Sequence, residues 1–285
     1  VLSDKGLDWI ARVVMKLSLP TMIFVNVISQ VDRTALVQSL SIIGLAVTAS
    51  ILLFGLGVAL TKLFHVEGDR SQIYRAMTMF GNVGFMGIPI IEELYGKGAI
   101  IYVVLYSFVY SIIFYSYGIY LFEKEKALQT GEKAKIKFEW KKMINPGIAA
   151  SLIAMVIFLF QIKVPAPAVS FVDYLGNSCI PLSMILTGVS VAKLPLIEVF
   201  KDKKMYFFTF LKMLVIPIIA AVLIRNFHLD PVLSGIMVLM FGMPNGSMAV
   251  MMSIDYGLDS SICSRGIVLT TLLSIITLPI VAYLI

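Results

Sequence analysis

Long apolar runs recur along the whole sequence, and they limit the folds that it can adopt. A run of about 20 apolar residues lets one helix cross the hydrocarbon core of a bilayer. In lipid, only helices and closed barrels satisfy their own backbone polar groups, and the runs lack the alternation of barrel strands. We therefore predict an all-α polytopic membrane protein. Its nine spans cover roughly residues 9–29, 36–63, 73–94, 98–122, 146–162, 167–191, 205–226, 232–253 and 261–284.

The composition agrees with this prediction. Hydrophobic residues make up 59% of the 285 residues and charged residues 14%. A soluble domain of this length has too little core to bury that much apolar surface, so the lipid bilayer is the expected partner. A net charge of +6 would suggest nucleic acid for a soluble protein. Here the lysines lie between apolar runs, so they indicate membrane topology and no nucleic-acid binding.

The basic residues also predict an orientation. The lysine-rich segment 123–144 is expected in the cytoplasm, because loops rich in Lys and Arg stay inside. Alternation of the spans then places the C-terminus outside the cell, in the plasma membrane or, for a bacterium, the inner membrane. The segment divides the chain into a first half, 1–123, a cytoplasmic linker, 124–144, and a second half, 145–285.

The two halves share landmarks at one constant offset of 161 residues. The second half has five spans, and an odd number places its copy upside down relative to the first, as in inverted-repeat transporters. The first half has only four, so we expect that a first helix is missing before Val1; a natural nine-span protein is the alternative. The matching landmarks are Phe80-Gly81 with Phe241-Gly242, Tyr95-Gly96 with Tyr256-Gly257, and Pro20 with Pro181.

Two spans at equivalent places in the halves contain clusters of Gly and Pro. Span 73–94 holds FGNVGFMGIP and span 232–253 holds FGMPNGS. Proline and glycine favour an unwound stretch, and the half-helix that follows presents free N–H groups suited to a carboxylate. The alternative is a pair of kinks that only help packing. The predicted substrate-binding residues of the two clusters are Asn82, Gly84, Pro89, Pro244, Asn245, Gly246 and Ser247.

Other polar residues inside the spans are further candidates. Asn26 and Asn177 lie on the Pro20 and Pro181 helices, and Tyr106 is one of several tyrosines in span 98–122. Lys16 and Lys212 lie at similar depth and are candidates for pairing with an anion or for coupling to protons. The alternatives are interhelical hydrogen bonds for the amides, packing for the tyrosine, and extension of both lysines to the membrane surface.

Motifs along essentially the whole chain resemble the auxin efflux carrier family, including its bacterial malate-permease-like members. The resemblance implies ten spans in two inverted five-helix repeats, and a scaffold domain beside a transport domain with crossed broken helices. The implied fold is similar to that of bile acid:sodium symporters and sodium-proton antiporters. The motifs are Asn82–Pro89, Tyr95-Gly96, Asn145-Pro146, Ile180-Pro181-Leu182, Thr187-Gly188, Pro244-Asn245-Gly246 and the stretch Thr270–Pro279.

The resemblance also implies movement of organic anions. Plant auxin carriers tend to have glutamine where this chain has Tyr106, which favours a small carboxylate such as malate over an auxin-like acid. We therefore expect a secondary or facilitative carrier that works by alternating access. The alternatives are a sodium- or proton-coupled symporter of another solute and a membrane sensor that does not transport. The scaffold is also a candidate homodimer interface.

No chemistry beyond binding is predicted. The sequence contains no nucleophile elbow, no HExxH motif and no P-loop, so neither an enzyme nor an ATP-driven pump is expected. Cys179 and Cys263 match no metal-binding spacing, and neither a metal nor a cofactor is predicted.

Overall fold

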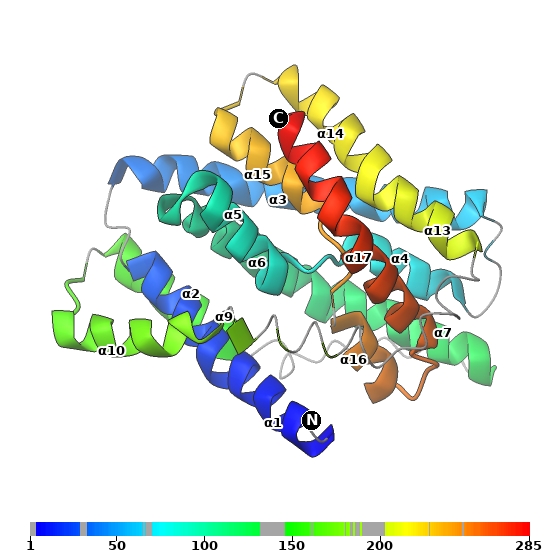
Figure 1. Cartoon of the computed structure of the whole chain (residues 1–285), viewed down its shortest axis with the longest axis horizontal. Helices are drawn as coiled ribbons and strands as arrows, with labels where there is room; N and C mark the ends of the chain where they lie inside the picture. Colours follow the sequence, from blue (N-terminus) through cyan, green and yellow to red (C-terminus); the bar gives the residue numbers. More distant parts are fainter. Residues whose placement is uncertain are drawn as a thin grey trace.

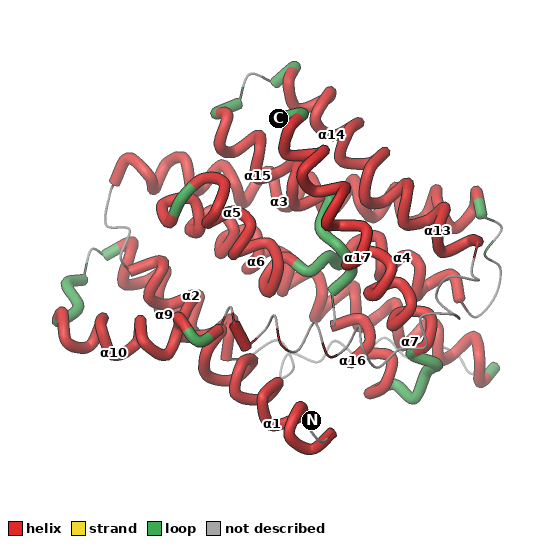
Figure 2. The backbone as a smooth tube through the Cα atoms, viewed as in Figure 1, coloured by secondary structure: helices red, strands yellow, loops and turns green. Residues whose placement is uncertain are grey.

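The computed structural model describes residues 4–28, 33–64, 66, 70–131, 146–160, 162–179, 181–182, 185, 189, 203–227, 229–246 and 248–285. This part of the chain is helical, with one isolated β-bridge (Figures 1 and 2). Four described stretches are long and apolar enough to cross a membrane: Ser41–Leu63, Lys97–Thr130, Lys203–Arg225 and Ser261–Tyr283. The prediction of an all-helical polytopic membrane protein agrees with this architecture.

The first half contains α1 (Asp4–Val13), the π-helical η1 (Val14–Ser18), α2 (Leu19–Ile28), α3 (Arg33–Leu63), α4 (Ser71–Met79), the π-helical η3 (Val83–Gly87), α5 (Ile88–Tyr95), the short 3-10 helix η4 (Lys97–Ala99), α6 (Ile100–Ile113), the π-helical η5 (Phe114–Gly118) and α7 (Ile119–Thr130). The second half contains α9 (Pro146–Leu159), α10 (Ala166–Asn177), α13 (Lys203–Phe210), the π-helical η6 (Leu211–Val215), α14 (Ile216–Arg225), α15 (Pro231–Phe241), α16 (Met248–Asp255) and α17 (Ser261–Tyr283).

Helix α7 extends beyond the predicted end of its span. It continues to Thr130, so the start of the predicted 124–144 linker is helical. The sequence EKEKALQT consists mainly of good helix formers, which explains the extension. Gly131 then ends the helix with a left-handed φ of 71°, a conformation that glycine adopts without steric cost. Residues 132–144 lie outside the described part.

The helices form two groups. Helix α2 packs against both α9 and α10, whereas α3–α7 pack with α13–α17 (Figure 1). In the first group, a Cβ added at Gly176 of α10 would lie 2.9 Å from Met22 Cα of α2, so glycine permits the close approach. The hydroxyls of Ser18, at the end of η1, and Ser178, just after α10, share a hydrogen bond of 2.7 Å.

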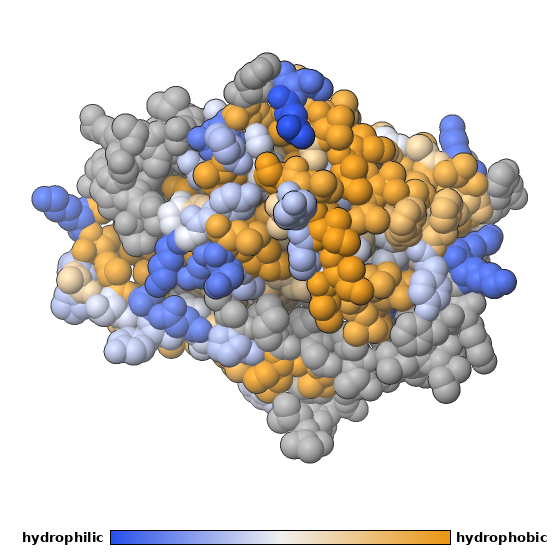
Figure 3. Space-filling model, turned by 45° about the horizontal axis from the view of Figure 1, so that its top comes forward, coloured by the Kyte–Doolittle hydropathy of each residue, from blue (hydrophilic) through white to orange (hydrophobic). Residues whose placement is uncertain are grey.

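Large apolar side chains are exposed over the second group. Figure 3 shows a broad hydrophobic face, and Val222 of α14 and Ile275 of α17 are 60% and 73% exposed. A monomeric soluble protein rarely exposes apolar patches of such extent. These helices therefore present the surface that lipid is expected to cover.

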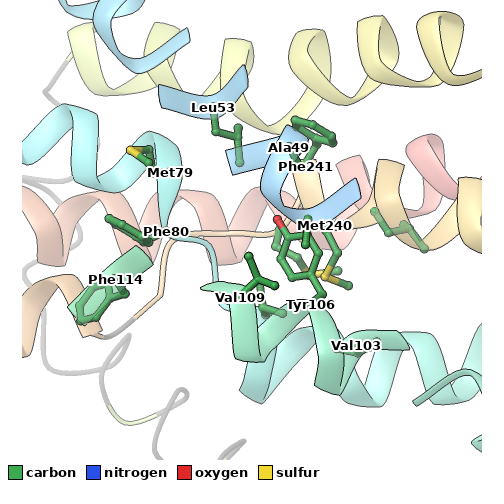
Figure 4. Close-up of a cluster of buried hydrophobic side chains, with 14 of the residues drawn as sticks. Ala49, Leu53, Met79, Phe80, Val103, Tyr106, Val109, Phe114, Met240 and Phe241 are labelled. Atoms are coloured by element: carbon green, nitrogen blue, oxygen red, sulfur yellow. The ribbon is translucent and has the colours of Figure 1, made fainter. Parts of the chain in front are cut away.

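Aromatic side chains pack tightly where α4 ends. The rings of Phe80 and Phe114 meet edge to face with centroids 4.8 Å apart (Figure 4). Tyr110 also packs against both rings. A Cβ at Gly118 would lie 3.2 Å from the Phe80 ring, so the small residue makes room for it. This cluster fixes the position at which the chain leaves α4.

Candidate functional site

Two interrupted helices meet in the middle of the second helix group. Helix α4 ends at Met79 and helical structure resumes at Val83, while α15 ends at Phe241 and α16 begins at Met248. The intervening segments, drawn as loops in Figure 2, lie antiparallel, with Gly81 and Asn245 forming a β-bridge. Asn82 N donates to Pro244 O at 2.7 Å, and Gly246 N donates to Phe80 O at 3.3 Å. We call these two segments the crossing.

Small residues allow the two backbones to touch. A Cβ at Gly246 would lie 3.1 Å from Gly81 O, and one at Gly81 would lie 3.0 Å from Met243 Cβ. Pro244 has no N–H to continue a helix. Both interruptions thus fall within the predicted Gly/Pro clusters. Pro89, however, lies at the start of α5 and beyond the interruption itself.

Asn82 caps the half-helix that leaves the crossing. Its Oδ1 accepts a hydrogen bond from Phe85 N at 3.2 Å, and its side chain is largely buried. A capping side chain oxygen satisfies one of the free N–H groups at a helix start. A Cβ added at Gly84, in the first turn of this half-helix, would meet no atom within 4 Å. The positive end of this half-helix therefore borders open space.

Asn245 is fully buried and is held by two helical elements, η6 and α17. Its Oδ1 accepts a hydrogen bond from Lys212 Nζ of η6, and its backbone N donates to Thr270 Oγ1 of α17 at 3.0 Å. Its Nδ2 has no hydrogen-bond partner among the described residues. A Cβ at Gly266 would lie 2.8 Å from that nitrogen, so glycine makes room for the amide.

Lys212 reaches the crossing from a neighbouring helix. Its side chain is 2% exposed, and Nζ also donates to Met77 O near the end of α4. The last carbonyls of a helix lack intrahelical partners and carry partial negative charge, which favours a cation. Lys16, at similar depth in its own span, is exposed on η1 instead. Extension to the membrane surface therefore does not describe Lys212.

The other predicted site residues lie apart from the crossing contacts. Asn177 is exposed, and its Nδ2 donates to Asp173 Oδ2 of the same helix at 3.1 Å. Tyr106 is buried in the apolar cluster beside Met240 (Figure 4). The side chain of Asn26, and Ser247 as a whole, fall outside the described part of the structure.

Two residues at the crossing, and one arginine elsewhere on α4, were not among the predicted site residues. Thr270 and Gly266 of α17 contact Asn245, as described above. Arg75 of α4 lies within the same apolar span, where its Nε donates to Thr61 Oγ1 of α3 at 3.2 Å. An arginine inside a predicted span is itself a signal of function. Thr270 and Gly266 carry no such signal, because both residue types are common in membrane helices.

Comparison with known proteins finds transport proteins in each case. The family model described as "Membrane transport protein" matches residues 1–282. An uncharacterized transporter of Methanothermobacter thermautotrophicus is 21% identical over 280 residues, covering 98% of this chain and 89% of that protein. A protein of Rhizobium meliloti named "Putative malonate transporter" is 21% identical over 292 residues, covering 99% and 88%. An uncharacterized transporter of Methanocaldococcus jannaschii is 20% identical over 286 residues, covering 98% and 90%.

Proposed function

Since this chain belongs to the membrane transport protein family, which is the auxin efflux carrier family that its motifs resemble, we propose that it is a secondary carrier of a small organic anion. The observation that carries the proposal is the half-helix capped by Asn82, whose positive end borders open space beside Gly84. A helix N-terminus within the membrane suits a carboxylate, because it offers N–H groups and partial positive charge.

The charge balance at the crossing supports an anionic substrate. Lys212 brings a buried ammonium group, and Arg75 adds a second cation to the same helix group. Helices α4, α13, α14, α15 and α17 contain no Asp or Glu. A substrate carboxylate would therefore enter a region of positive potential, which favours its binding.

The presence of two helix groups supports alternating access as the mechanism. We assign α1, α2, α9 and α10 to a scaffold and α3–α7 with α13–α17 to a moving transport unit. The proposal includes two inverted repeats, 1–123 and 145–285, with the linker in the cytoplasm, the C-terminus outside, and the bacterial inner membrane as the location. Gly96 and Gly257, which differ by 161 positions, follow the two half-helices with φ of 80° and 69°, which supports the repeat.

Malonate is the first substrate to test, because one relative carries that name and a dicarboxylate suits the positive crossing. The purified chain is reconstituted in liposomes, and uptake of radiolabelled malonate is measured in wild type, Asn82→Ala and Asn177→Ala. We expect a loss of about tenfold in Asn82→Ala, because the capping oxygen that orders the N–H groups of the half-helix is lost. Asn177→Ala is the matched control, since its exposed amide bonds only within α10.

Each result has a distinct meaning. Uptake by Asn82→Ala at the wild-type rate would refute the assignment of the site. Binding of malonate without flux in the wild type would favour the sensor over the carrier. Circular dichroism of each variant verifies that the loss of uptake does not come from loss of fold.

A further inference from the structure

Lys212 places an ammonium group between the two interrupted helices. Nζ donates to the main-chain oxygen of Met77 and to the side-chain oxygen of Asn245, one from each side of the crossing. The normal helical donor to Met77 O would be the N–H of Gly81, which lies in the interruption. Lysine therefore replaces a hydrogen bond that the break removes, and its donor is the ionisable group of a side chain.

We propose that this position is a cation site that the protein fills with its own lysine. One ligand is a carbonyl oxygen at a half-helix C-terminus, a group that coordinates sodium ions in transporters with discontinuous helices. The other is the side-chain oxygen of an asparagine, a neutral oxygen ligand of hard cations. Thr270 Oγ1 also contacts Asn245, because it accepts the hydrogen bond that Asn245 N donates. The covalently attached ammonium takes the place of a coupling metal ion.

Among the described residues, no carboxylate bonds to this ammonium. The buried carboxylate of Glu125 on α7, which packs on α4, accepts a hydrogen bond from Gln72 N instead. Helices α4, α13, α14, α15 and α17 and the η6 turn contain no acidic residue. Asp255 and Asp259 flank the end of α16 and the start of α17, and Asp259 accepts hydrogen bonds from Ser261 there. The ammonium is therefore stabilised by dipoles and helix-end carbonyls, as a bound metal ion would be.

Chemical complementation tests the site without any assumption about the substrate. Lys212→Ala removes Cγ, Cδ, Cε and Nζ, which together correspond to a propylammonium group. We therefore add n-propylammonium chloride to the purified variant, with choline chloride at the same ionic strength as the control. We expect the unfolding temperature of the variant to fall by roughly 5 °C or more, because two buried acceptors lose their donor. Propylammonium is expected to restore at least half of the loss, and neutral 1-propanol is not.

Lys212→Met is the matched variant that keeps the unbranched apolar stem of the side chain and removes the ammonium group. We expect it to be destabilised and to gain nothing from propylammonium, because the methionine fills the space. A wild-type unfolding temperature in Lys212→Met, or a folded Lys212→Ala that propylammonium does not stabilise, would overturn the proposal. If Lys212→Ala does not fold, the readout is its monodisperse yield when propylammonium is present from solubilisation onward, and an equal yield without the amine counts against the site.

The link to transport rests on the proposed function and is tested separately. Malonate uptake by the wild type is measured with sodium and with choline on both sides of the membrane. We expect rates within about twofold of each other, since the site is already filled, and a strong requirement for sodium would contradict the inference. Absence of any malonate flux would refute only the substrate proposal, because the complementation by propylammonium does not depend on it.

Discussion

Replacing Thr270 with valine tests how the crossing is held. Thr270 Oγ1 accepts the hydrogen bond of Asn245 N at 3.0 Å and donates to Gly266 O at 2.6 Å. Valine keeps the shape of the side chain and removes the oxygen, so the fully buried N–H of Asn245 loses its acceptor. An unsatisfied buried donor costs about 1–3 kcal/mol. The carbonyl of Gly266 also accepts a backbone hydrogen bond within the helix, so losing the bond from the Thr270 hydroxyl adds little to the cost.

The adjacent residue provides a matched control. Thr271 lies on the same helix, and its buried Oγ1 has no hydrogen-bond partner among the described residues. Thr271→Val therefore removes no bond, and relief from burying the hydroxyl makes it neutral or slightly stabilising. Both variants change the same atoms in one helix, so helix propensity cancels between them.

The measurement is thermal unfolding of both variants in one detergent, followed by circular dichroism at equal protein concentration. A difference of about 2 kcal/mol corresponds to roughly 3–4 °C for a chain of 285 residues. We expect Thr270→Val to unfold first. If Thr270→Val is as stable as Thr271→Val, the bond from Asn245 N does not stabilise the crossing and the reasoning is refuted.

Three further substitutions test other contacts. In Gly266→Ala the new Cβ would lie 2.7 Å from Met77 Sδ, so overpacking of about 1–3 kcal/mol is expected, whereas Gly55→Ala faces open space and gains about 0.5–1 kcal/mol; unfolding temperatures in the reverse order would contradict this. Gly176→Ala is expected to separate α2 from α10 and lower stability, because the 2.9 Å contact is with backbone, and a wild-type melt would refute the contact. The N–H and hydroxyl of Ser261 hold the pKa of Asp259 below its usual 3.8, so its stabilisation is full above pH 3.8 and is lost as the pH falls through the depressed value. The difference in unfolding temperature between wild type and Asp259→Ala should therefore shrink on acidification, and a constant difference would exclude this charge effect.

The helix interruptions could be predicted because their cause is local. Glycine and proline change the backbone wherever they stand, so FGNVGFMGIP and FGMPNGS indicated two breaks without any knowledge of packing. The position of the first break was less certain from the same cluster. The helix ends at Met79, fixed by aromatic packing of Phe80, whereas Pro89 is tolerated at the start of α5.

The contacts across the crossing could not be predicted, because they join residues far apart in sequence. Thr270 and Gly266 reach Asn245 from α17, and their identities carry no local signal of that role. Asn177 shows the opposite case, in which a polar residue in an apolar span bonds within its own helix. Whether an amide is buried depends on the face of the helix that carries it. For this chain, the sequence alone did not show which helix face points inward.

Lys16 and Lys212 show why depth along a span does not determine the role of a charge. Both lie in π-helical turns of apolar spans, yet one is exposed and the other is 2% exposed. A lysine stem is long enough to carry its ammonium to the membrane surface, so burial persists only where the protein offers better partners than water. The interruption of α4 creates such a partner in Met77 O, and the second interruption presents Asn245 Oδ1 beside it. The breaks and the buried lysine therefore require each other: without the lysine, two buried oxygens lack a donor, and without the breaks, the ammonium has no reason to remain inside.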